Sequence, residues 1–163
     1  MPDQNLIPFK AKKTFILPNK TYEEGRDYEL HFLEVEVLIS EGLIEIIPLN
    51  SVNYRKMLKE EGSSEKVLEL DENFFNFARI SQRYLKERSN LSEIDKKVYS
   101  DSAAALRNFL RLRAEKILKA LLIENQKIEV HGSESDFISL IGIEISKWIR
   151  FNESIIKGEK YEV

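Results

Sequence analysis

The pattern of apolar and polar positions changes near residue 50, from short alternating segments to long helical periods. Thr14–Leu17 is rich in strand-forming residues, and Tyr28–Phe32 alternates as a half-buried strand does. Residues 1–8, with two prolines, predict an extended arm or a first strand. Pro18–Asn19 and the pair Gly25 and Asp27 predict turns. We therefore expect a small β-rich module over residues 1–50.

A short helix is the preferred interpretation of Leu33–Glu41, because Glu34 and Glu36 interrupt its apolar residues. Gly42 stands where a left-handed residue would end that helix, and Leu43–Ile47 follows as a strand that Pro48 ends. The alternative is a strand across Phe32–Ile39, since short apolar runs are ambiguous between the two states.

The rest of the chain predicts helices. Ser51 is expected to cap the first, which runs to Glu61 and ends at Gly62–Ser64, and Asp71 to cap the second, which ends at Arg88. The second has one aromatic face, formed by Phe74, Phe77, Ala78, Ser81, Tyr84 and Leu85.

Two longer helices follow. Ser92 with Asp95 resembles a capping box for a helix to about Asn125, whose spacing predicts a bundle seam. The seam residues are Ala103, Leu106, Leu110, Ala114, Ile117 and Leu121. After a polar loop over residues 126–135, Ser135 or Asp136 is expected to cap a last helix, and a frayed tail to begin at Lys157. One face of that helix carries Ile138, Ile141, Ile145, Trp148 and Ile149. The expected fold is α+β and mostly α, with a β-rich domain at 1–50 and a helical domain at 51–163.

The apolar faces of these helices are wider than one monomer is expected to cover. Contiguous exposed apolar surface usually marks a partner site. The candidate subunit-interface residues are Phe74, Phe75, Phe77, Tyr84, Leu112 and Trp148. The alternative for the aromatic residues among them is an ordinary core.

Composition narrows the function classes. The 163 residues are 42% hydrophobic, and no run approaches the ~18 apolar residues of a membrane span. The first residues lack the pattern of a signal peptide, so a cytoplasmic protein is expected. Absence of cysteine excludes disulfides, thiolate zinc sites and cysteine nucleophiles from this sequence.

The net charge of −3 does not favour a dedicated duplex binder, because phosphate neutralisation supplies most of that affinity. Two basic groups are nevertheless candidates for a nucleic-acid or acidic-partner patch. The first consists of Lys10, Lys12 and Lys13 along the first strand, with Lys20 nearby, and the second of Arg107, Arg111, Arg113, Lys116 and Lys119 along the long helix. The alternative is a solvated surface, on which Glu115 pairs with Lys119.

No catalytic motif accompanies this organisation. His131, Glu134 and Asp136 gather in one segment, but a metal site needs three or four converging ligands and the only other histidine is His31. Phosphate-binding glycine loops and nucleophile elbows do not occur in the sequence. We expect no catalytic residue, cofactor or metal. A small hydrolase built on Glu134 and Asp136 is the least favoured alternative.

The organisation resembles an archaeal GINS subunit of the type with the β domain first, related to Psf-two and Psf-three. Three segments carry the resemblance: Gly25–Leu30 with the following helix, Gly42 and strand; the aromatic helix entry Leu70–Arg79; and the long-helix run Ser102–Ile117. The family often has a proline at the entry to its first helix, and Leu30–Leu33 has none.

The resemblance implies a non-catalytic subunit of a tetramer in DNA replication. Such a subunit pairs with a paralogue in which the helical domain comes first. The complex bridges the MCM helicase to a Cdc-type or RecJ-like partner and, in some lineages, contacts primase. Direct contact with DNA would be secondary, and the location would be cytoplasmic, at the nucleoid. A small nucleic-acid-binding regulator is the alternative function.

Overall fold

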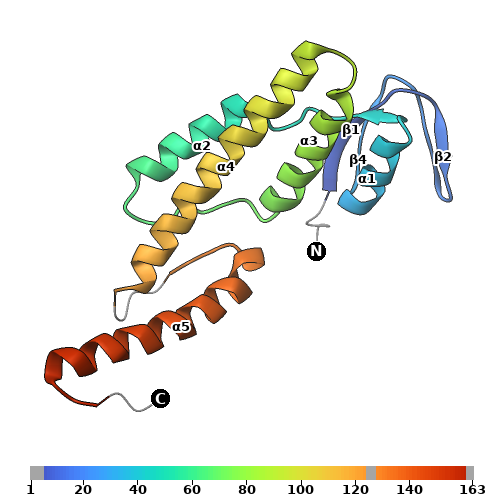
Figure 1. Ribbon diagram of the computed structural model, residues 1–163. Coiled ribbons are helices and arrows are strands. Elements are labelled where there is room, and N and C mark those ends of the chain that lie inside the picture. The colour runs from blue at the N-terminus through green and yellow to red at the C-terminus, as the bar shows by residue number, and fades with distance from the viewer. Residues whose placement is uncertain (1–5, 124–127, 161–163) are drawn as a thin grey trace.

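The computed structural model describes residues 6–123 and 128–160, and it places a small β module ahead of a larger helical part (Figure 1). The elements are β1 (Leu6–Ala11), β2 (Phe15–Leu17), β3 (Lys20–Tyr22), β4 (Asp27–His31), α1 (Phe32–Ser40), β5 (Ile44–Glu45), α2 (Ser51–Ser63), α3 (Phe74–Arg88), α4 (Glu93–Leu121) and α5 (Gly132–Lys157). The expected α+β, mostly helical class is confirmed.

The β module is a three-stranded antiparallel sheet in the order β4-β1-β5, beside a β2–β3 hairpin. β1 alternates as predicted for a strand with one buried face, with Ile7, Phe9 and Ala11 turned inward. The hairpin turns at Pro18–Asn19, and the rings of Phe15 and Tyr22 stack across it at 4.9 Å. Only residues from Leu6 onward of the expected N-terminal arm are described.

The helical interpretation of the segment after β4 is confirmed, and the strand alternative is wrong. α1 covers the inner face of the sheet with Val35, Leu38 and Ile39. Gly42 follows it with φ of +66°, the left-handed conformation expected of a residue that ends a helix. The strand predicted at Leu43–Ile47 is paired only at Ile44–Glu45.

α2 and α3 form as expected, with different ends. Asn50 caps α2 in a reciprocal box with Asn53, so the expected Ser51 cap is wrong by one position. α2 ends at Ser63, within the segment Gly62–Ser64 that was predicted to end it. Asp71 shapes the turn before α3, because its side-chain oxygen accepts the amide of Asn73 at 2.9 Å.

The cap of α4 is confirmed, since the Ser92 hydroxyl oxygen accepts the Asp95 amide at 3.0 Å. The helix ends at Leu121, earlier than predicted. The predicted seam is confirmed in part: Ile117 is buried and Leu106 and Leu110 pack against the helical core, whereas Ala114 is exposed. The buried stripe consists of Ser102, Ala105, Phe109, Arg113 and Ile117. The large ring of Phe109 and the paired guanidinium of Arg113 face the neighbouring helices. The buried side of α4 is therefore rotated away from the side that its aliphatic residues predict.

α5 begins at Gly132, earlier than the predicted Ser135 or Asp136, and His131 caps it. It ends at Gly158, whose φ of +69° is left-handed, and residues 159–160 follow without regular structure. Residues 126–127 of the expected loop lie outside the described residues. Residues 161–163 of the expected tail also lie outside them. Within the described ranges, no helix combines the length and the apolar character that crossing a membrane requires.

The buried apolar residues form two cores, one in the β module and one among the helices, and α3 contributes side chains to both. Ile80, 1% exposed, completes the core of the β module with Val35 and Ile39, while Phe74 and Ala78 join Tyr54 and Phe109 in the helical core. Arg83 of α3 also binds Glu36 of α1, with 2.6 Å between Nη1 and Oε1. The β module therefore rests on a helix from beyond the residue-50 boundary.

Candidate subunit interface

α5 has no buried residue, although it is 26 residues long and rich in large apolar side chains. It extends beyond the C-terminal end of α4, away from the sheet (Figure 1). Between 41% and 77% of each of the following side chains is exposed: Phe137, Leu140, Ile141, Ile143, Trp148, Phe151, Ile155 and Ile156. Contiguous exposed apolar surface of this kind is typical of a protein–protein contact.

The end of α4 extends this apolar surface. Leu118, Leu122 and Ile123 are 42% to 59% exposed. Where α5 passes α4, the contact is close, because a Cβ at Gly142 would lie 3.7 Å from Cδ2 of Leu121. We define the exposed apolar side chains of α5, with these three, as the α5 surface.

A buried ionic cluster holds the first turn of α5. Arg113, 1% exposed, donates from Nε and Nη2 to the two carboxylate oxygens of Glu134, both at 2.8 Å. Its Nη1 donates to the Leu68 carbonyl at 2.6 Å and to Glu61 Oε2 at 3.3 Å. A fork of this kind suits guanidinium, because its donors are fixed in a plane. Arg113 thus connects α2, the segment before α3, and α5.

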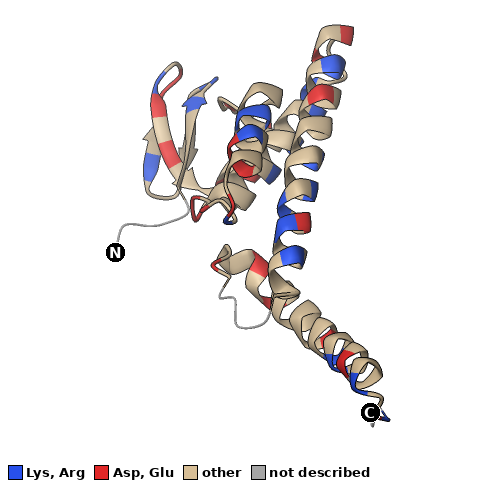
Figure 2. Ribbon diagram, turned by 90° about the vertical axis from the view of Figure 1, so that its left-hand side faces the viewer, with Lys and Arg blue, Asp and Glu red and all other residues tan. Residues whose placement is uncertain are grey.

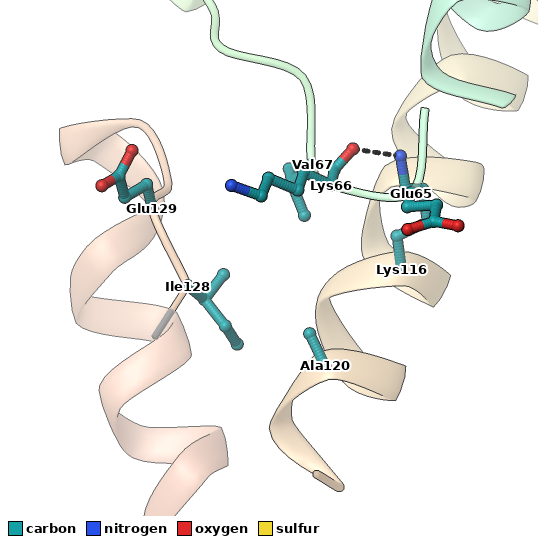
Figure 3. Close-up of a pocket in the computed structure, with 7 residues that line it drawn as sticks. All are labelled: Glu65, Lys66, Val67, Lys116, Ala120, Ile128 and Glu129. Atoms are coloured by element: carbon teal, nitrogen blue, oxygen red, sulfur yellow. Dashed lines mark hydrogen bonds between the residues drawn. The ribbon is translucent and has the colours of Figure 1, made fainter. Parts of the chain in front are cut away.

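Lys116 completes the cluster on the side of α2. Its Nζ lies 2.8 Å from Glu61 Oε1 and donates to the carbonyls of Glu61 and Ser64. It also donates to the carbonyl of Lys66 (Figure 3). These carbonyls belong to the last turn of α2 and the segment after it, where helical partners run out. Beside them, Val67, Ala120 and Ile128 line a hollow of about 160 Å³ (Figure 3). The two cations balance Glu61 and Glu134, so the cluster is neutral.

His131 fixes the entry to α5 through both ring nitrogens. Nδ1 accepts the Ser133 amide at 3.1 Å, and Nε2 lies 2.9 Å from the Glu72 carbonyl. Because Nδ1 accepts a hydrogen bond, Nε2 carries the ring proton and donates it in a hydrogen bond to the Glu72 carbonyl. The imidazole also contacts the ring of Phe75 edge to face, with 4.8 Å between centroids.

These contacts occupy side chains that were candidates for a metal site or for hydrolysis in the segment around His131. Glu134 binds Arg113 and both nitrogens of His131 have partners, while Asp136 is exposed. Across residues 6–123 and 128–160, no group of three or more histidine or acidic side chains is placed to hold a metal ion. The structure assigns His131 and Glu134 to the anchoring of α5.

The interface candidates from the sequence separate into two sets. Phe74 is 7% exposed and packs on Phe109 at 5.8 Å between centroids, so it belongs to the core of the chain. The half-buried candidates are Phe75, Phe77, Tyr84 and Leu112, which pack against neighbours within the chain. Trp148, 56% exposed, lies on the α5 surface.

The sequence pattern identified only one apolar face of α5 and missed the apolar residues on its other side. Phe137, Leu140, Phe151 and Ile156 are exposed in the structure and were not among the candidates. The sequence does contain a sign of this exposed surface, because large apolar residues occur around most of the circumference of α5. A helix with that pattern is either fully buried or covered by a partner.

The two basic groups do not form one patch. Lys10 lies between Asp27 and Glu45 in the sheet register, and Lys12 and Lys13 are exposed in the bend after β1. Arg107 and Arg111 are exposed on α4, which other helices separate from the sheet (Figure 2). Arg111 also lies 4.0 Å from Glu115 of its own helix.

No protein-family model matches the chain, and no curated protein matches it either.

Proposed function

We propose that this chain is a non-catalytic subunit of a GINS-type complex in DNA replication, and that α5 is a surface through which it joins the assembly. The observation that carries the assembly role is the α5 surface: α5 is a long, apolar helix that is held at its first turn and passes close to α4, and none of its described residues is buried. The order of a small β module before a helical part supports the GINS-type assignment.

In such a complex the helical part joins a paralogous subunit, and the β module remains accessible for contact with other proteins. The complex would join the MCM helicase to a Cdc-type or RecJ-like protein, with primase as a further contact, in the cytoplasm at the nucleoid. It would activate the helicase by binding the active conformation more tightly than the idle one, since a ligand shifts an equilibrium only through that difference. The buried ionic cluster around Arg113 would keep α5 in one orientation while the chain binds its partner subunit.

Affinity purification of the tagged chain from its source cells tests the proposal. We expect MCM and a helical-domain-first paralogue to co-purify. The double variant W148E/F151E should lose the paralogue, because it places two charges on the α5 surface. I94E is the matched control, since Ile94 is equally apolar and 76% exposed on the far end of α4. Recovery of neither MCM nor a paralogue would contradict the proposal.

The nucleic-acid-binding alternative has one supporting observation, the exposure of Arg107 and Arg111 on α4. It predicts binding that weakens steeply as salt rises, because each neutralised phosphate releases counterions. A filter-binding assay at low salt with R107E/R111E as the comparison decides it. Binding that these substitutions abolish would favour the alternative, and absence of binding at low salt would exclude it.

A further inference from the structure

The end of α2 gathers four oxygen atoms around one cation. The carbonyl oxygens of Glu61 and Ser64 and the carboxylate oxygen Oε1 of Glu61 each lie 2.8 Å from Nζ of Lys116. The carbonyl oxygen of Lys66 is the fourth (Figure 3). An ammonium group has three N–H donors, so the four oxygens surround its charge rather than pair one to one with its protons.

The backbone of α2 and of the segment after it places three of these oxygens. Carbonyls in the last turn of a helix have no partner within the helix, and they carry the negative end of its dipole. α2 has no basic residue of its own in that turn. At Ser64 the chain becomes extended, with φ of −99° and ψ of 139°, and the carbonyls of Ser64 and Lys66 meet that of Glu61 at the same ammonium. The result is a cluster of oxygen atoms that requires a cation.

Burial makes this requirement strong. The side chain of Glu61 is 0% exposed and that of Lys116 is 14% exposed. Glu61 and Glu134 bring two negative charges into the cluster, and Arg113 balances one of them. Without the Lys116 ammonium one negative charge would be uncompensated, and an unpaired charge inside a protein is costly. The cluster therefore needs one further positive charge.

The distances and the charge indicate which ions fit. Mg²⁺ binds oxygen at roughly 2.0–2.1 Å and Ca²⁺ at about 2.3–2.6 Å, and both are shorter than the 2.8 Å at Lys116. A divalent ion would also leave the cluster with a net positive charge. Potassium carries one charge, and backbone carbonyls replace its hydration shell in channels. Ammonium carries the same charge and makes the N–H···O contacts that Lys116 makes.

We propose that the end of α2 is a monovalent-cation site that the chain fills with its own Lys116 ammonium, and that free ammonium or potassium binds there when this side chain is removed. A hollow of about 160 Å³ beside Lys116, lined in part by Val67 and Ala120, gives a small ion room to enter, since a water molecule takes up ~30 Å³ (Figure 3). The natural chain consequently needs no external ion at this point. The inference is independent of the replication role, because it concerns how a single chain is held together.

Ion-specific rescue of K116A tests the site. Thermal unfolding, followed by far-UV circular dichroism, is compared in ammonium, potassium and tetramethylammonium chloride at equal concentration. In tetramethylammonium chloride K116A should have a lower midpoint than the natural chain, because that cation is too bulky for the site and has no N–H donor. Ammonium and potassium should each raise the K116A midpoint as their concentration rises, as mass action requires of an ion that binds the folded chain.

K119A is the matched control, because Lys119 is an exposed lysine of the same helix. The natural chain and K119A should show no comparable difference among the three salts. A K116A midpoint that responds to the salts only as that of K119A does would overturn the proposal. Equal midpoints of K116A and K119A in tetramethylammonium chloride would also overturn it, since the oxygens would then need no cation.

Nuclear magnetic resonance of the natural chain tests the occupancy without a destabilising change. With ¹⁵N-labelled lysine, the ammonium protons of exposed lysines exchange rapidly with water near neutral pH, whereas those held by four oxygens should exchange slowly enough to give an Nζ signal. The signal should disappear in K116R, which keeps the charge but replaces the ammonium by a planar guanidinium, and it should remain in K119R. Absence of the signal from the natural chain would contradict the coordinated ammonium, even if K116A failed to fold in every salt.

Discussion

At the scale of single residues, Arg113 has the largest structural consequence. It is almost completely buried, and it binds Glu61, Glu134 and the Leu68 carbonyl. A buried charge pair adds little net stability compared with well-packed apolar residues, but removing one partner leaves the others uncompensated. The main effect of the cluster is to fix the position and direction of the first turn of α5 relative to α2 and α4.

Replacing Arg113 by methionine should destabilise the chain by about 3–5 kcal/mol, because the buried carboxylates lose the guanidinium between them. Glu134 then retains the His131 amide, and Glu61 retains Lys116 and the Leu68 amide. Urea unfolding followed by far-UV circular dichroism measures the change. R107M is the control on the exposed side of the same helix, where surface substitutions usually change stability by less than ~0.5 kcal/mol. Equal effects of the two variants would contradict the buried cluster.

Tyr54 provides a test based on pH. Its side chain is fully buried, its hydroxyl has no hydrogen-bond partner within the described residues, and burial raises its pKa from 10.0 to about 12. The neighbouring Gln82 side chain acts in the opposite direction but does not offset burial. Because the folded-state pKa exceeds the unfolded value, this residue's contribution is fully present below pH 10 and is lost as pH rises toward 12.

The variant Y54F should therefore be about as stable as the natural chain at pH 7, since the lost hydroxyl makes no hydrogen bond. Between pH 10 and 12 it should lose less stability than the natural chain. Urea unfolding across this pH range measures both differences. Parallel pH profiles for the two proteins would show that Tyr54 does not resist ionisation.

At the scale of elements, α5 depends on its first turn. His131 caps the helix and also reaches the Glu72 carbonyl and the Phe75 ring, so the entry direction is fixed by the segment before α3. After that turn, α5 passes close to Leu121 of α4, and none of its described residues is buried. An element attached in this way retains most of its apolar surface for a partner.

Substituting His131 by alanine should loosen the first turns of α5 by about 1–2 kcal/mol, because the cap and the contact with Glu72 are both lost. Hydrogen exchange over residues 132–140 measures the change. H131N retains a capping side chain without reaching Glu72, and it should have an intermediate effect. If H131N and H131A exchange at the same rate, the cap does not stabilise this helix.

Local sequence chemistry predicted most elements but not the environment of α4 and α5. Ser92 with Asp95 and Gly42 act as their residue types predict. Arg113 could not be assigned to the interior, because its partners Glu61 and Glu134 are 52 and 21 residues away in the chain. For the same reason the buried positions Ala105 and Phe109 were not among the seam residues predicted for α4. The exposure of α5 depends on which elements cover it, and periodicity alone does not determine that.

At the scale of the whole molecule, α3 couples the β module to the helical part. Ile80 lies in the first core, whereas Phe74 of the same helix lies in the second. Because one rigid helix takes part in both cores, the two parts should unfold together. The residue-50 boundary separates secondary-structure types rather than independent folding units.

Replacing Ile80 by alanine should cost about 2–5 kcal/mol and lower the thermal midpoint of both parts. Near-UV circular dichroism reports aromatic packing in both parts, including Tyr22 in the β module and Tyr54 in the helical core, and the far-UV signal reports the helices. I94A, at an exposed position of similar chemistry, should leave the midpoint almost unchanged. Two separate transitions in I80A, with the helical one unaffected, would contradict this coupling.

We expect α5 to be covered when the protein is assembled, and hydroxyl-radical footprinting measures that protection. Phe137, Trp148 and Phe151 are 69%, 56% and 42% exposed in the isolated chain and should be oxidised readily. In the native assembly all three should become protected, while Leu91, 71% exposed at the far end near α4, stays reactive. Unchanged oxidation of these aromatic residues in the assembly would contradict the account.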